Sequence, residues 1–124
     1  MGMYTGLRGT ITFKPDVANV LRERGDWNWE ELAYHLNSDA VKDFANKNRC
    51  NFIPKGALSY MPSDWDEVVN KWIDDTTYSF ACSLKNYEEE IATFIGILPE
   101  IADYWELEEL YEEADCPDIH RSGQ

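Results

Sequence analysis

Carboxylates are the residues of this chain whose number and spacing most suggest chemistry. Six of them fall within ten positions, and they are Glu106, Glu108, Glu109, Glu112, Glu113 and Asp115. In a strand these charges would lie about 5.5 Å apart on average, and in a helix about 2.5 Å apart. One strand of nucleic acid carries a charge about every 3.4 Å. A helix would therefore match the charge density of a phosphate backbone, whereas a strand would need the nearby acids Glu88 to Glu90 as well.

Charge is divided unequally along the chain. The formal net charge is −13. Residues 86–124 contain twelve acids against Arg121 alone, whereas residues 1–85 contain twelve acids against ten Lys and Arg residues. Such a charge repels phosphates, so it disfavours direct binding to nucleic acid or to an anionic membrane and favours basic partners or cations. The acidic segment thus has two interpretations: a face that is only solvated, or a surface that binds a basic protein by mimicking nucleic acid.

Neither a metal site, a cofactor site nor a disulfide framework is predicted. His35 and His120 lie in no metal-binding spacing. The acids at positions 64–67 lack the glycine and the final glutamate of a calcium-binding EF-hand loop, and a helix start explains them better. The three cysteines are Cys50, Cys82 and Cys116. Their odd number and wide spacing are typical of ordinary thiols, and no local signature pairs a nucleophile with a base.

The elements that must position these residues fit one domain. A chain of 124 residues with 44% hydrophobic and 14% aromatic content can bury a single core. We place this domain at residues 3–115 and expect a loose tail at 116–124. The longest charge-free apolar run, Ile91 to Pro99, is shorter than the roughly 20 residues of a membrane span. No N-terminal signal pattern is present, so we expect a cytoplasmic protein without membrane contact.

Alternation of apolar and polar residues predicts four strands. They lie near residues 4–13, 57–61, 77–84 and 104–113. The last segment is ambiguous, because its apolar residues also fit a helical stripe. We favour a strand there, since it completes a β-α-β-β-α-β order. That order predicts an α+β fold of the ferredoxin-like type, with extra helices inserted between the first two strands.

Apolar stripes and capping residues predict five helices. They begin at or after Asp16, Asp26, Asn37 or Ser38, Ser63 and Asn86. The last of them carries acids in its first turn, where they meet the positive end of the helix dipole. Pro99 should end or kink this helix, because proline lacks the N–H that a helix interior requires.

The chain also contains distinctive blocks of sequence. They are MYTGLR at 3–8, FIP at 52–54 followed by GALSYMP at 56–62, CSLKNY at 82–87 and YEE at 111–113. These blocks resemble a family of small, uncharacterised phage and prophage proteins. The resemblance implies a viral context and hence the cytoplasm of a host cell. It implies no catalytic or ligand-binding residue.

In that context we expect a non-enzymatic interaction protein without cofactors. Its partner would be a basic host protein or nucleoprotein complex. The most concrete expectation is a nucleic-acid-handling defence complex, such as a CRISPR effector or a restriction system, that the chain inhibits. The carboxylates between Glu106 and Asp115 would then form the partner-binding surface.

Two alternatives remain open. If the shared blocks lie together in the fold, Arg8, Lys55 and Lys85 could form a pocket for an anionic small molecule. The chain would then be a small enzyme or a ligand-binding module. The other alternative is an accessory protein that associates with itself.

Overall fold

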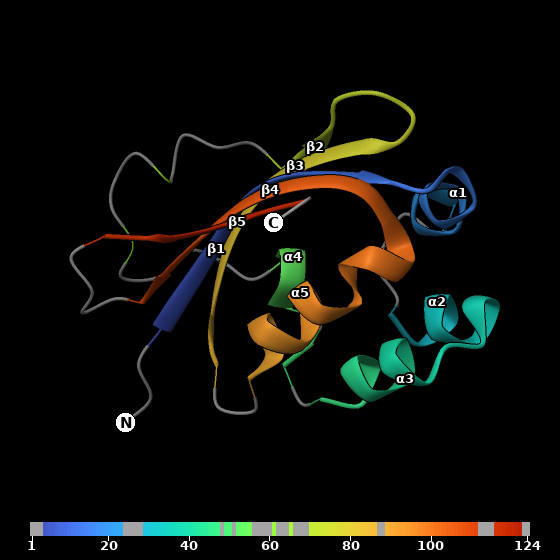
Figure 1. Ribbon diagram of the computed structural model, residues 1–124, viewed down its shortest axis with the longest axis horizontal. Helices are drawn as coiled ribbons and strands as arrows, with labels where there is room; N and C mark the ends of the chain where they lie inside the picture. Colours follow the sequence, from blue (N-terminus) through green and yellow to red (C-terminus); the bar gives the residue numbers. More distant parts are fainter. Residues whose placement is uncertain are drawn as a thin grey trace.

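A five-stranded antiparallel sheet forms the main layer of the computed structural model (Figure 1). The structure describes residues 4–23, 29–47, 49–50, 52–55, 61, 65, 70–86, 89–111 and 116–122. Within these ranges the strands are β1 (Tyr4–Phe13), β2 (Lys71–Trp72), β3 (Thr77–Lys85), β4 (Ala102–Tyr111) and β5 (Asp118–Arg121). Their order across the sheet is β2-β3-β1-β4-β5. Strand β1 is therefore central, and β2 and β5 are the two edges.

The two faces of the sheet differ in polarity, because successive side chains of a strand point to opposite faces. The inner face is formed by buried apolar residues, among them Leu7, Ile11, Phe80, Cys82, Leu84 and Leu107. The outer face is formed by the alternate positions, among them Arg8, Thr10, Ser79, Glu106, Glu108 and Arg121. One face thus contributes to the core, and the other is largely polar.

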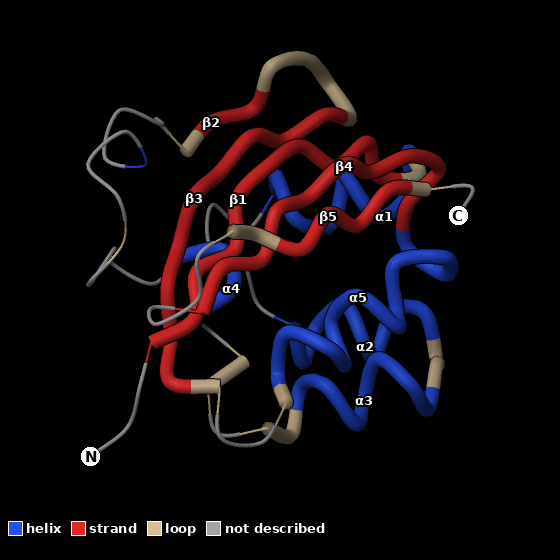
Figure 2. Tube along the Cα trace, turned by 60° about the vertical axis from the view of Figure 1, so that its left-hand side comes forward, coloured by secondary structure: helices blue, strands red, loops and turns tan. Residues whose placement is uncertain are grey.

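Helices cover the inner face. Their bounds are α1 (Pro15–Glu23), α2 (Trp29–Leu36), α3 (Asp39–Ala45), α4 (Phe52–Lys55) and α5 (Glu90–Ile101). Helices α2, α3 and α5 lie together on one side of the sheet, and α1 follows directly from β1 (Figures 1 and 2). Helix α4 is a single turn with extended backbone at Ile53, as expected for a residue that precedes proline. None of the described helices is long and apolar enough to cross a membrane.

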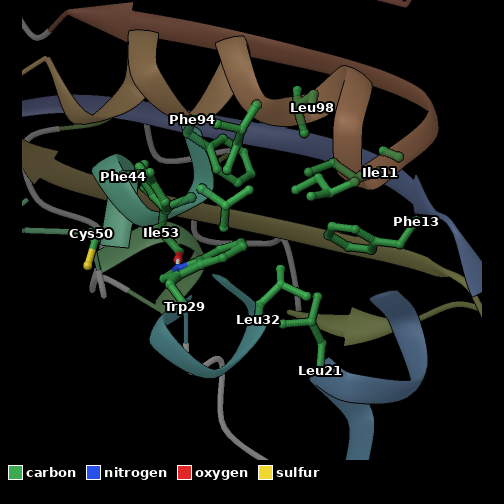
Figure 3. Packing of buried hydrophobic residues seen from close by; sticks show 14 of the residues in the cluster. Ile11, Phe13, Leu21, Trp29, Leu32, Phe44, Cys50, Ile53, Phe94 and Leu98 are labelled. Atoms are coloured by element: carbon green, nitrogen blue, oxygen red, sulfur yellow. Dashed lines mark hydrogen bonds between the residues drawn. The ribbon is translucent and has the colours of Figure 1, made fainter. Parts of the chain in front are cut away.

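An aromatic cluster joins the helices in the core (Figure 3). The ring of Trp29 in α2 meets Phe44 of α3 edge-on at 5.1 Å between centroids and Phe94 of α5 at 5.6 Å. Such edge-to-face pairs contribute about 0.5–1.5 kcal/mol each beyond their buried area. The indole N–H of Trp29 also donates a hydrogen bond to the carbonyl of Ile53 in α4 at 2.8 Å. One side chain therefore connects four helices beneath the sheet.

The N-cap of α3 is Ser38, one of the two residues that the sequence predicts, whereas the predicted N-cap of α5, Asn86, is wrong. The hydroxyl of Ser38 accepts a hydrogen bond from the Val41 N–H at 3.4 Å at the start of α3. The N-cap of α5 is Glu89, which makes no side-chain cap hydrogen bond. Asn86 lies three residues earlier, and its side-chain carbonyl accepts a hydrogen bond from the Ile91 N–H at 3.0 Å. Helix α5 does not end before Pro99, because it continues to Ile101 with the proline inside it.

The α+β class predicted from the sequence is confirmed, but the ferredoxin-like topology is not matched. The sheet has five strands in the order β2-β3-β1-β4-β5. Its second strand is the two-residue β2 at Lys71–Trp72, which lies where the helix starting after Ser63 was expected. The amide side chain of Asn70 extends this short edge, because its oxygen accepts the Ala81 N–H of β3 at 2.9 Å. Of the strand predicted at 57–61, only residue 61 is described, and it is not in a strand.

Strand β4 decides between strand and helix for the segment that was ambiguous in the sequence, residues 104–113. Strand β4 confirms the predicted strand over residues 104–111, whereas residues 112 and 113 lie outside the described residues. The segment 116–124 was expected to be a loose tail. It instead contains β5, which pairs with Glu106–Glu109 of β4. A domain that ended at residue 115 would omit this edge strand.

Gly9 permits a close approach of β1 and β4. Its φ is 145°, a conformation essentially restricted to glycine. A Cβ atom at this position would overlap the carbonyl group of Glu106 and lie 2.9 Å from the Cα of Leu107. Any other residue would have to push the two central strands apart.

This contrast predicts opposite effects for two glycine substitutions. Gly9→Ala should lower the free energy of unfolding by about 1–3 kcal/mol, because it combines backbone strain with a clash. Gly96→Ala, on the exposed side of α5, should raise it by about 0.5–1 kcal/mol, since a Cβ there has no heavy atom within 4 Å. Urea unfolding monitored by tryptophan fluorescence measures both values. Equal effects of the two substitutions would contradict the register of β1 against β4.

Candidate functional site

Strand register gathers charged side chains in two rows across the outer face. In the first row, Arg8 of β1 lies between Ala81 of β3 and Glu108 of β4. In the second row, Glu106 of β4 lies opposite Arg121 of β5. Directly opposite side chains on one face of an antiparallel pair are about 4.5–5.5 Å apart at Cβ. Two arginines and two glutamates thus come from three adjacent strands to one region.

These rows line a groove of about 380 Å³ on the outer face. Its polar lining consists of Arg8, Thr10, Ser79, Glu106, Glu108 and Arg121. The side chain of Ile119, which is 43% exposed, adds an apolar part to the β5 side of the groove. The volume lies near the lower end of the roughly 300–1,000 Å³ of small-molecule pockets. The groove is the candidate site that the described residues define best.

Arg8 is the most constrained charge in the groove. Its Nε and Nη2 donate to one carboxylate oxygen of Glu108 at 3.3 and 3.1 Å. Its guanidinium also lies over the ring of Trp65, 4.6 Å from the ring centroid. A cation–π contact of this kind contributes about 0.5–1 kcal/mol at an exposed site. Arg8 is therefore fixed between an aromatic ring and a carboxylate.

Two further glutamates of β4 also contact basic side chains of β5. Glu106 lies 3.5 Å from Nη2 of Arg121, and both side chains are about half exposed. Glu109 lies 3.0 Å from Nε2 of His120, a contact that is an ion pair only when the imidazole is protonated. With the Arg8–Glu108 pair, each of the three described carboxylates of the predicted partner-binding set thus has an internal partner. Glu112, Glu113 and Asp115 lie outside the described residues.

The strand conformation of β4 weakens the phosphate-mimicry interpretation. Glu106 and Glu108 are two residues apart on one face, which corresponds to about 6.6 Å in a strand. Phosphates along one nucleic-acid strand are about 3.4 Å apart. Of the acids at the start of α5, Glu90 is fully buried and Glu89 is exposed, whereas Glu88 lies outside the described residues. Direct imitation of phosphate spacing by β4 is therefore not favoured.

The structure does not bring Arg8 and Lys85 into one pocket. Both lie on the outer face, but the register places Lys85 opposite Tyr4, four residues from Arg8 along β1 and thus about 13 Å away. On the same face of β1, Gly6 lies between Tyr4 and Arg8 and is covered by Met61 and the buried Trp65. A Cβ atom on Gly6 would lie 2.5 Å from the Met61 sulfur. The side chain of Lys55 lies outside the described residues. The predicted anion pocket thus keeps only Arg8 as a lining residue of the groove.

Other candidate residues are separate from the groove. His35 is exposed on α2, and Cys82 is fully buried in the core. Burial raises the pKa of the Cys82 thiol far above its usual range, so the reactive thiolate is disfavoured there. Among the described residues, no group of three or more His, Cys, Asp and Glu side chains is placed to hold a metal ion.

The sequence did not identify three of the polar groove residues, Thr10, Ser79 and Arg121. Thr10 and Ser79 occupy polar positions of predicted strands, and the alternation alone indicated that they face away from the core. Arg121 was assigned to the expected tail, since four residues after a proline give too short a pattern to predict a strand. Pairing with β4 brings it to the groove.

Comparison with protein-family models, with curated proteins and with solved structures finds no match to this chain. The relation to small phage proteins therefore stays a prediction that rests on the sequence blocks alone. Fold and groove define an α+β protein with helices on one sheet face and a charged groove on the other.

A double-mutant cycle tests the Arg8–Glu108 pair. Arg8→Met retains the apolar stem of the side chain and removes its charge, and Glu108→Gln removes the charge of the carboxylate. We expect a coupling energy of about 0.5–1 kcal/mol in urea unfolding, because two N–H groups reach one oxygen of a partly shielded carboxylate.

The matched control is the same cycle on Arg22 and Asp75. These side chains are 3.7 Å apart and 40% and 94% exposed, so we expect no measurable coupling between them. A coupling energy for Arg8 and Glu108 no larger than that of the control would contradict the geometry of the groove.

Proposed function

We propose that this chain is a phage-encoded, non-enzymatic interaction protein that binds a basic surface of a host nucleic-acid-handling defence complex and inhibits it. CRISPR effectors and restriction systems are the defence complexes that fit this proposal best. The observation that carries it is the charge of residues 86–124, which contain twelve acids and, of Lys and Arg, only Arg121. The viral context comes from the resemblance of the sequence blocks.

The location of the acids supports binding at the β4–β5 side of the sheet. Asp103 at the start of β4 and Asp118 in β5 are exposed, and neither has a cationic partner among the described residues. Arg8 and Arg121 offset only part of the charge around them. The acidic potential that results attracts a basic protein over several ångströms and accelerates its association. It also repels free nucleic acid, which prevents the phosphate backbone from competing for the same surface.

The ion pairs of β4 support a protein surface as the partner more than they support mimicry of a phosphate backbone. A carboxylate that shares its charge with an internal arginine attracts an external cation less strongly. The same pair holds the carboxylate in one position, which reduces the entropy lost on binding. A partner with a few well-placed Lys or Arg side chains therefore fits this surface better than a groove built for evenly spaced phosphates.

A second candidate function is the binding of a small anionic ligand in the outer groove. The observation that favours it is the presence of Arg8 and Arg121 in a groove of about 380 Å³. The two glutamates in the same lining offset these positive charges. Binding of a basic partner is therefore the favoured function.

A phage-challenge experiment tests the proposed function with two variants of equal charge. The test variant combines Glu112→Gln, Glu113→Gln, Asp115→Asn and Asp118→Asn, and it leaves the paired glutamates of β4 unchanged. The control variant combines Glu30→Gln, Glu31→Gln, Asp39→Asn and Asp43→Asn on α2 and α3. Each is expressed in cells that carry an active CRISPR or restriction system, and phage plating is measured.

The wild-type chain and the control variant should raise phage plating, and the test variant should raise it about tenfold less. Each exposed charge pair contributes about 0.2–1 kcal/mol, and tenfold in affinity corresponds to about 1.4 kcal/mol. Equal protection by both variants would contradict charge-based binding at this side of the sheet. Absence of protection by the wild-type chain against every system tested would contradict the defence role itself.

A further inference from the structure

Strand β5 is an exposed edge of the sheet. It is the last strand in the order β2-β3-β1-β4-β5, and no further strand pairs with it among the residues that the structure describes. Asp118, Ile119 and Arg121 are exposed, and His120 is partly buried. Unpaired backbone groups at such an edge are a template for another strand unless something covers them.

The hydrogen-bonding direction of β5 follows from its register with β4. The N–H of Ser122 donates to the carbonyl of Trp105 at 2.9 Å, and the register places these two residues opposite each other. Hydrogen-bonded pairs alternate along an antiparallel ladder, which makes His120 the next bonded residue of β5. The N–H and C=O groups of Ile119 and Arg121 therefore point away from β4, toward the exposed edge.

We infer that β5 binds an extended, basic segment of a partner protein by strand addition. This inference rests on the proposed function and names the structural mode of that binding. Backbone hydrogen bonds to Ile119 and Arg121 would hold the segment, and side chains of the segment would give specificity. Addition of a strand to a sheet edge is a general mode of peptide recognition.

Charge favours a basic segment over a second copy of this chain. Each copy has a formal net charge of −13, so two copies repel each other as they approach. A segment with Lys or Arg residues is attracted by the same field. Its residues next to Asp118 would place their cations beside an exposed carboxylate, with Glu109 behind it on the neighbouring strand.

The register also predicts the side-chain pattern of the segment. Residues opposite Ile119 and Arg121 form the hydrogen bonds and point to the outer face, where Ile119 lines the groove. An apolar residue next to Ile119 would cover its exposed side chain. Residues opposite Asp118 and His120 point to the other face, where the carboxylates favour Lys or Arg. The predicted segment therefore alternates apolar and basic residues, and the apolar residues are those whose N–H groups face β5.

A pair of isomeric peptides tests this mode of binding with the wild-type protein. The probe is an acetylated and amidated Lys-Val-Lys-Val-Lys-Val peptide. One isomer is methylated on the valine backbone nitrogens and the other on the lysine backbone nitrogens. Both keep the same charge and composition, but only the second keeps the N–H groups on the edge that is predicted to face β5. Amide hydrogen exchange of Ile119 and Arg121 is followed by NMR during titration.

The probe and the lysine-methylated isomer should bind and slow exchange of both amides. At 90% saturation only the free tenth of the protein exchanges, so the slowing should be about tenfold. The valine-methylated isomer should leave these amides unprotected. Equal binding of the two isomers would overturn strand addition while leaving charge-based binding, and thus the proposed function, intact. Absence of saturable binding by the probe would also overturn it.

A variant of the protein gives an independent arm of the test. Ile119→Pro removes an N–H that faces away from β4, and proline is tolerated at such edge positions. We expect this variant to lose probe binding and Ile119→Ala to retain it. Protection of Ile119 and Arg121 that rises with protein concentration in the absence of peptide would show that a second copy occupies the edge, and would overturn the inference.

Discussion

The close approach of β1 and β4 at Gly9 is the constraint on which the rest of the structure depends. Only a residue without a Cβ fits beside the carbonyl of Glu106 with a φ of 145°. This contact sets the register of the two strands, so that Arg8 lies opposite Glu108 and Leu7 faces the core. A slip by one residue would turn every side chain of a strand to the opposite face, which would bury the charges and expose the core.

With that register in place, the two faces of the sheet have separate roles. The inner face is covered by helices that Trp29 ties together through two aromatic contacts and one hydrogen bond. Part of the outer face is covered by Trp65 above Gly6. Among the described residues, an accessible groove lies on the outer face beside β4 and β5. Of the carboxylates in the acidic C-terminal third, Glu106 and Glu108 therefore line the uncovered groove.

The structure changes the interpretation of the acidic segment, because it shows which basic side chains contact its carboxylates. A sequence shows how many carboxylates a segment contains, but it does not show which cations fold back onto them. Glu108 is one hundred positions from Arg8 along the chain, and only the pairing of β1 with β4 joins them. The contact between Glu109 and His120 likewise requires β5. Charge counted along the sequence therefore overestimates the charge that a partner meets at these residues.

Long elements with a regular pattern were predictable, and short ones were not. The alternation in Thr77–Lys85 and the apolar stripe of α5 were sufficient to predict a strand and a helix there. Strands β2 and β5 contain two and four residues, so their pairing partners define them and their own sequences do not. Since Arg121 lies on β5, the candidate groove could be predicted only in part.

The groove and the exposed edge both depend on the pairing of β5 with β4. Amide hydrogen exchange of the free protein, resolved by residue with NMR, tests it most directly. This pairing predicts slow exchange for the amides of His120 and Ser122, which donate to β4, and fast exchange for those of Ile119 and Arg121, which face away from it. Uniformly fast exchange from Asp118 to Ser122, or protection with the opposite alternation, would contradict it.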